Sequence, residues 1–267
     1  MIKKIITPII CLTLILTLCL PVYANTLTVN GQGLDAYIEN GITYASVREF
    51  TEQYAGYSVG WNDKAKIATV KGTDLEAEVY QGRAYSVANG RVLVRDGINR
   101  NKAGRVYAPV TELAEMFSAK VEWDSSTRRV TVTGGGQALT PAQSYYNSED
   151  LYWLSRIISA ESRGESFMGK CGVGNVVLNR KASSQFPNTV KDVIFDTKFG
   201  VQFSPISDGS IYNEPTSDSI MAAKAVLDGF VKVKDALYFL NPRTAVNSWI
   251  INNRRFCTRI GNHDFYY

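Results

Sequence analysis

One segment of the sequence occurs twice, and this duplication constrains the fold more than any other feature. Residues 43–70, TYASVREFTEQYAGYSVGWNDKAKIATV, align with residues 106–132, VYAPVTELAEMFSAKVEWDSSTRRVTV, when one residue is left out in the middle. The matched pairs include Tyr44 with Tyr107, Glu49 with Glu112 and Trp61 with Trp123. Two copies of one unit predict a domain with two similar halves. We therefore expect residues 27–133 to form one domain.

Each copy has the pattern of a strand, a helix and two further strands. A helix is expected after the first short strand, because mostly apolar residues recur there at helical spacing on one face. They are Val47, Phe50, Thr51 and Tyr54 in the first copy, and Val110, Leu113, Ala114 and Phe117 in the second. NDKA and DSST then carry turn-forming residues between two strands. This domain is expected to be α+β, with Trp61 and Trp123 in its core rather than as platforms for sugars.

The N-terminus resembles an export signal. Lys3 and Lys4 precede an apolar run over residues 5–20, and Val22 and Ala24 occupy the positions that a signal peptidase reads. We expect residues 1–24 to be removed, which would leave no stable membrane span. A membrane anchor is the alternative, but the run is short for a ~20-residue span.

Composition narrows the function classes. The net charge of +4 includes the lysines of the signal, so the mature chain is only mildly basic. Such a charge fits an anionic wall surface and does not indicate nucleic acid. The single histidine and the two mature cysteines, Cys171 and Cys257, disfavour a transition metal, and no cofactor is expected. The cysteines are compatible with one disulfide or with two thiols.

A glycine-rich segment separates the two halves of the chain. Residues 134–147, GGGQALTPAQSYYN, predict a flexible linker. Residues 148–267 then change to helical patterns, with one long loop over residues 200–215 and one strand over residues 236–240. The fold class expected for the whole chain is therefore two domains, with a mainly α domain at the C-terminus.

An acid lies at the end of the first of these helical patterns. Leu154, Ile157 and Ile158 form an apolar stripe, and Glu161 continues it toward the core. Loss of water on one side raises the pKa of a carboxyl group, which can then donate a proton near neutral pH. The alternative is a structural Glu161 paired with Arg156 or Arg163.

The duplicated domain resembles the stalk domain related to the N-terminal domain of copper amine oxidases. The shared features are the Tyr–Val, Trp–Asn/Asp and Val positions of both copies. The resemblance implies a spacer or wall-contact module, and copper ligands are missing from these residues.

The C-terminal half resembles the catalytic domain of spore cortex-lytic, germination-type cell-wall hydrolases. The segments RIISAESRGESFMGKCGVGNVVLNR, FPNTVKDVIFD, QFSPISDG, ALYFLNP and IGNHDFYY follow in the order of that family. The resemblance implies a lysozyme-like fold and peptidoglycan glycan strands as substrate. Well-known members are lytic transglycosylases, in which one Glu, here Glu161, acts as acid and then as base. It further implies a secreted, wall- or spore-associated enzyme.

The resemblance also implies residues that support Glu161 or line a substrate groove. They are Ser162, Glu165, Gln202, Phe203, Tyr238, Asn241 and His263. Asp208 is interpreted either as a further groove residue or as a turn residue, and Arg180 as a brace for its helix. Two alternatives remain: a true hydrolase in which Glu165 activates water, and a wall-binding or spore structural protein with an inactive fold.

Overall fold

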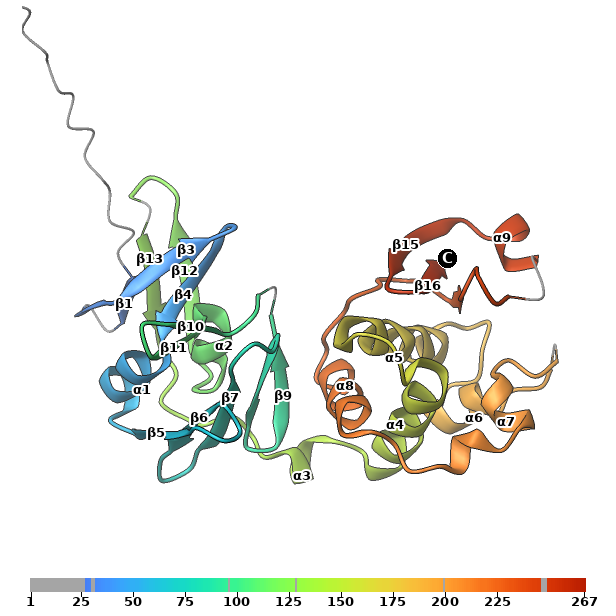
Figure 1. The fold of residues 1–267 in the computed structure, drawn as a ribbon, viewed down its shortest axis with the longest axis horizontal. Coiled ribbons are helices and arrows are strands. Elements are labelled where there is room, and N and C mark those ends of the chain that lie inside the picture. The colour runs from blue at the N-terminus through green and yellow to red at the C-terminus, as the bar shows by residue number, and fades with distance from the viewer. Residues whose placement is uncertain (1–26, 30–31, 96, 128, 199, 246–248) are drawn as a thin grey trace, which may run out of the picture.

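The computed structural model describes residues 27–267 except residues 30–31, 96, 128, 199 and 246–248. The expected signal segment, residues 1–24, lies outside the described residues. A β-rich N-terminal domain lies beside a mainly helical C-terminal domain (Figure 1). Within the described part of the chain, every helix is too short or too polar to cross a bilayer.

The described residues of the N-terminal domain form three sheets. The first has the order β12-β13-β1-β2, with β1 (Leu27–Val29), β2 (Gln32–Leu34), β12 (Lys120–Asp124) and β13 (Arg129–Thr133). The second has the order β10-β11-β4-β3, with β3 (Ala36–Glu39), β4 (Ile42–Ser46), β10 (Arg100–Lys102) and β11 (Arg105–Pro109). The third has the order β5-β6-β7-β8-β9, with β5 (Ser58–Asn62), β6 (Ile67–Lys71), β7 (Glu76–Tyr80), β8 (Tyr85–Ala88) and β9 (Arg91–Val94).

Two helices lie among these sheets, one in each copy of the duplicated segment. Helix α1 (Val47–Ala55) begins after Ser46, whose hydroxyl accepts a hydrogen bond from the Glu49 amide, and ends at Gly56, with φ of 67°. Helix α2 (Val110–Glu115) follows β11. Most of the expected faces are buried: Val47, Phe50 and Thr51 in α1, and Val110, Leu113 and Ala114 in α2. Tyr54 is half-buried, and Phe117 is buried but follows the end of α2.

The two copies have different neighbours in the sheets. Strands β4 and β11, which precede the two helices, pair antiparallel with each other. The strands after α1 join the five-stranded sheet, whereas those after α2 join the four-stranded sheet, in which β1 and β13 pair in parallel. Residues at equivalent positions therefore have different environments.

The prediction that Trp61 and Trp123 lie in the core is wrong. Trp61 is 41% exposed and Trp123 is 51% exposed. Each is the fourth residue of an edge strand, β5 or β12, of its sheet. An edge strand has no neighbour on its outer side, so a side chain near its end is not covered.

The C-terminal domain is mainly helical, as expected. Its helices are α4 (Ser148–Ser162), α5 (Phe167–Ala182), α6 (Val190–Ile194), α7 (Ser204–Ser207), η1 (Ser210–Tyr212), α8 (Ser217–Leu227) and α9 (Trp249–Asn253). The sheet order is β14-β16-β15, with β14 (Tyr238–Leu240), β15 (Phe256–Ile260) and β16 (His263–Tyr266). The expected loop over residues 200–215 is thus wrong in part, because α7 and η1 lie within it.

Helix α4 is positioned by an apolar stripe along one face and by a capping residue at its N-terminus. The Asn147 side chain accepts hydrogen bonds from the amides of Glu149 and Asp150 at its start. Leu154, Ile157 and Ile158 are fully buried, as their spacing predicted, and pack with α5 and α8. The sequence pattern therefore fixed which face of α4 turns inward.

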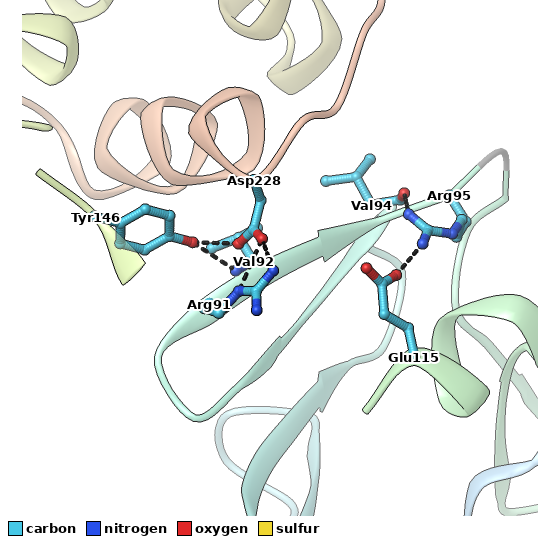
Figure 2. Close-up of polar contacts among 7 residues, drawn as sticks. All are labelled: Arg91, Val92, Val94, Arg95, Glu115, Tyr146 and Asp228. Carbon is cyan, nitrogen blue, oxygen red and sulfur yellow. Dashed lines mark hydrogen bonds and ion pairs between the residues drawn. The ribbon is translucent and has the colours of Figure 1, made fainter. Parts of the chain in front are cut away.

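The two domains share a buried interface, in which β9 packs against α8 (Figure 1). Arg91 Nε donates to Asp228 Oδ1 at 2.8 Å, and the Tyr146 hydroxyl donates to the other Asp228 oxygen (Figure 2). The side chains of Arg91 and Asp228 are only 9% and 5% exposed. Tyr85, Val92 and Val94 of the N-terminal domain belong to the same apolar cluster as the helices of the C-terminal domain.

The segment expected to be a linker is packed against the N-terminal domain. It contains α3 (Ala142–Tyr145). Leu139 is buried, and the Ala142 amide donates to the Asn89 carbonyl at 2.9 Å. Cys171 and Cys257 are free thiols, the first buried and the second half-buried, so the disulfide alternative is not realised.

Candidate active site

Glu161 lies on the last turn of α4, at the inner end of the apolar stripe. It is half-buried. Burial raises the pKa of its carboxyl group to about 7. Within the described residues, no hydrogen bond or ion pair holds this carboxyl group. Near neutral pH the group can therefore be protonated while it keeps its bonding capacity for a ligand.

The two arginines expected as alternative partners of Glu161 bind another residue. Arg156 Nη2 donates to Glu214 Oε1 at 2.8 Å, and Arg163 Nη2 donates to the Glu214 carbonyl at 3.2 Å. Both guanidinium groups are thereby engaged beside α4 without neutralising Glu161. The structural alternative for Glu161, an ion pair with one of these arginines, is wrong.

Two other charges act on the Glu161 carboxyl group. After burial, the negative charge of Asp208 is the next influence that raises its pKa, and Arg180 lowers it. Asp208 follows α7, and Arg180 lies on the last turn of α5. The sequence left Asp208 open between a groove and a turn residue and predicted a brace for Arg180, because no spacing along the chain relates either of them to Glu161.

Arg180 is the centre of a small aromatic cluster. Its guanidinium carbon lies 5.1 Å from the Phe203 ring centroid and 5.5 Å from that of Tyr238. Nε donates to the Leu237 carbonyl at 2.7 Å, so the predicted bracing role also has a contact. Nη1 is buried and has no hydrogen-bond partner among the described residues. The cluster thus brings two predicted groove residues, Phe203 and Tyr238, to the guanidinium group whose charge acts on Glu161.

Ser162 is turned inward. It is buried, and its hydroxyl donates to the Ile158 carbonyl one turn earlier in α4. A hydroxyl used in this way supports the end of the helix. This placement favours a structural role for Ser162 over direct contact with substrate.

Glu165 joins the turn after α4 to the turn between β15 and β16. Its carboxylate accepts hydrogen bonds from the amide and the side chain of Asn262, at 3.0 and 2.8 Å. Burial raises the pKa of Glu165, but these hydrogen bonds outweigh it and the pKa is lowered. An ionised carboxylate that accepts two hydrogen bonds from Asn262 is suited to holding the turn between β15 and β16.

His263 lies on β16, near the Glu165 turn. Its ring centroid is 5.3 Å from that of Phe239. Burial lowers the pKa of His263, while the charge of Glu165 opposes this shift. Nδ1 is buried and lacks a hydrogen-bond partner among the described residues. A neutral imidazole in this position keeps one nitrogen available.

Gln202 and Asn241 use their side chains locally. Gln202 Nε2 donates to the Gly200 carbonyl at 2.9 Å. Asn241 Oδ1 accepts from the Arg243 amide at 3.0 Å. These bonds shape the turns before α7 and after β14, so substrate contact by either residue stays a prediction.

Two cavities of the described chain lie away from Glu161. One of 340 Å³ lies between the domains and is lined by β9, Arg95, Glu115 and the 228–231 turn. The other, of 200 Å³, lies beside Trp61 in the N-terminal domain. The cleft expected next to Glu161 therefore stays a prediction.

Each half of the chain matches a known domain family. Residues 164–266 match Cell Wall Hydrolase, and residues 28–132 match the copper amine oxidase N-terminal domain. The first match begins three residues after Glu161, so it does not include the proposed acid. Both resemblances inferred from the motifs are confirmed.

Individual relatives agree with these matches. A spore cortex-lytic enzyme of Bacillus cereus is 31% identical over 185 residues, which are 62% of this chain and 70% of the relative. One of Oceanobacillus iheyensis is 34% identical over 133 residues, 50% of this chain and 46% of the relative. The solved catalytic domain of the germination-specific lytic transglycosylase SleB from Bacillus anthracis is 35% identical, with a TM-score of 0.43; 48% of this chain and all of that chain are covered. On the similarity to the Bacillus cereus enzyme, this chain belongs to the spore cortex-lytic enzymes, a family of cell wall hydrolases.

Proposed function

We propose that this cell-wall-degrading enzyme is a lytic transglycosylase that cuts peptidoglycan between N-acetylmuramic acid and N-acetylglucosamine, with Glu161 as its single acid and base. In the first step, the Glu161 carboxyl group donates its proton to the glycosidic oxygen, and the bond from that oxygen to the muramyl C1 breaks. The leaving N-acetylglucosamine takes the proton and the bonding electron pair.

In the second step the same group acts as a base. The Glu161 carboxylate accepts the proton of the muramyl 6-hydroxyl, whose oxygen bonds to C1 and closes the 1,6-anhydro ring. The carboxyl group is then protonated again, and no water has been consumed. One carboxyl group with a pKa near the working pH suits both steps.

One observation carries this proposal: Glu161 is a half-buried acid with its pKa raised to about 7 and no bonding partner among the described residues. An acid that served only to stabilise the fold would be expected to be paired or hydrogen-bonded. The Arg180 guanidinium and the aromatic rings beside it would then contact the sugar on one side of the cleaved bond.

Product mass tests the reaction. Purified peptidoglycan is digested with the full chain, and the soluble fragments are weighed by mass spectrometry. Fragments that end in anhydromuramic acid, one water lighter than hydrolysed ones, are expected. Fragments that have all gained water would contradict the proposal.

Hydrolysis is a second candidate, and the position of Asp208 favours it. Its charge raises the pKa of Glu161, so a second carboxylate acts on the proposed acid. Hydrogen bonds from Ser210 lower the pKa of Asp208, which keeps it ionised and able to activate water. Digestion in water enriched in heavy oxygen separates the two reactions, because only hydrolysis places the label in the new muramyl end.

The finer assignments belong to the same proposal. We place the substrate in the spore cortex, because the relatives are named spore cortex-lytic enzymes. The chain would act after export and loss of residues 1–24, with residues 27–133 as a wall-contact domain of two repeated units and residues 148–267 as the catalytic domain. Digestion of cortex and of vegetative walls by the same preparation tests the choice of substrate.

A further inference from the structure

Trp61 presents an aromatic surface beside a cavity. The cavity of 200 Å³ lies between the start of α1, strands β5 and β6 and the turn from β10 to β11. Its apolar lining includes Val47, Ala68 and Val106, which are buried. Sites for drug-sized ligands measure ~300–1,000 Å³, so this one suits a smaller group.

A hydrogen bond to Asp63 orients the Trp61 ring before any ligand binds. Its indole Nε1 donates to Asp63 Oδ1 at 3.3 Å, and Lys66 Nζ pairs with the same oxygen at 2.8 Å. A ring held in place by a second residue loses little freedom on binding, which favours affinity.

The charged groups at the rim of the cavity are all engaged in ion pairs, with two arginines facing three carboxylates. Arg105 Nη1 lies 2.9 Å from Glu49 Oε1 and 3.3 Å from Asp35 Oδ2, and Arg48 pairs with Glu52. Both of these arginines are bound by carboxylates, and each of the three carboxylates is held by an arginine, so none of these groups is left unpaired to select an anion or a cation. The rim offers donors and acceptors around an apolar floor and an aromatic ring, which suits a neutral group with hydroxyl and amide functions on one side and C–H groups on the other.

We propose that the Trp61 cavity binds one N-acetylated sugar residue of a wall glycan strand. The inference rests on the proposed function, because the polymer cut at Glu161 supplies this chemistry along its length. A second contact on the same polymer raises the local concentration of substrate at the other domain. The N-terminal domain would then be a glycan-binding module and not only a spacer.

Trp123 provides a matched control within the same domain. It occupies the equivalent position in the second copy and is more exposed than Trp61, at 51% against 41%. It lines neither of the two cavities described above. Any general tendency of exposed tryptophan to adhere to walls would therefore affect Trp123 at least as strongly.

The experiment uses the full chain with Glu161→Gln, so that the polymer is not cut. Binding is measured by sedimentation with peptide-free glycan from purified peptidoglycan, and by tryptophan emission with a soluble N-acetylglucosamine hexamer. Trp61→Ala is expected to raise the half-saturating glycan concentration about fivefold and to remove part of the emission change. Trp123→Ala should match the parent, and Trp61→Phe should recover part of the affinity.

Several results would overturn the proposal. These are parental binding by Trp61→Ala, equal losses in Trp61→Ala and Trp123→Ala, or a loss seen only with peptide-bearing wall, which would identify the stem peptide as the occupant. The chain with Glu161 intact is assayed in parallel for fragment release. No release would refute the proposed function, whereas release together with unchanged binding by Trp61→Ala would refute only this inference.

Discussion

Glu112 and Glu161 are two acids in different domains, and burial raises the pKa of each to about 7. Their surroundings differ. Glu112 is completely buried in the N-terminal domain, and the Ser86 hydroxyl donates to its Oε1. Glu161 is half-buried, and no described residue bonds to its carboxyl group. A raised pKa alone therefore does not identify a catalytic acid; access and free bonding capacity distinguish the two.

The same substitution in both acids gives the largest expected contrast. Glu161→Gln keeps the shape and removes the proton, so release of fragments from peptidoglycan should fall about 10³-fold. Glu112→Gln should retain activity within about twofold, because that side chain is closed to substrate. Circular dichroism would check that both variants fold. A Glu161→Gln chain with more than a tenth of parental activity would contradict the assignment.

The interface between the domains determines whether the domain of Glu112 and the domain of Glu161 unfold together. Arg91→Ala leaves Asp228 buried without its cation, which should lower the free energy of unfolding by about 3–5 kcal/mol. Thermal unfolding is expected to separate into two transitions. Arg83→Ala is the matched control. The Arg83 side chain is 51% exposed and that of its partner Asp218 is 38% exposed, so this ion pair contributes less than about 1 kcal/mol to the free energy of unfolding. Equal losses in both variants would contradict the role of the buried pair.

Glu112 should make stability depend on pH. Below pH 4.5 the carboxyl group is protonated in both states. Between pH 4.5 and about 7 it ionises in the unfolded chain first, so the stability contributed by the protonated group is lost as the pH rises. Glu112→Gln cannot ionise, and from pH 5 to pH 8 it should lose about 3 kcal/mol less than the parent.

Urea unfolding at the two pH values measures this difference. Glu49→Gln is the control at the equivalent position of the first copy, where the carboxylate is partly exposed and bonded to Arg105. Parallel stability curves for Glu112→Gln and the parent would show that Glu112 is already ionised in the folded protein.

Asp208 should have the smallest effect, on the pH profile of the reaction. Activity is expected to fall as the pH rises through about 7, because Glu161 loses its proton. Asp208→Asn removes a charge that raises the pKa of Glu161, so this decline should move to lower pH and activity at pH 8 should fall about threefold. Activity near pH 5 should change little. If the activity of Asp208→Asn declines at the same pH as that of the parent, the influence of Asp208 on Glu161 is refuted.

The position of Glu161 in the candidate site could be predicted from helical periodicity. The stripe Leu154, Ile157 and Ile158 placed Glu161 at the inner end of α4, and the spacing of apolar residues gave the buried faces of α1 and α2. The groups that act on Glu161 were not accessible, because Asp208 and Arg180 approach it from other segments. Turn formation by SDG and bracing by Arg180 were local interpretations of residues whose second role depends on distant parts of the chain.

The duplicated segment shows which properties follow from the sequence and which depend on tertiary packing. The alignment of the two copies pairs Glu49 with Glu112 and Trp61 with Trp123, and their shared pattern predicts one helix between strands in each copy. The packing of the sheets then buries Glu112, leaves Glu49 to pair with Arg105 at the surface, and leaves both tryptophans exposed, none of which follows from the alignment. The reason is physical: local periodicity fixes which side of a helix or strand a residue occupies, whereas burial depends on the elements that pack against that side.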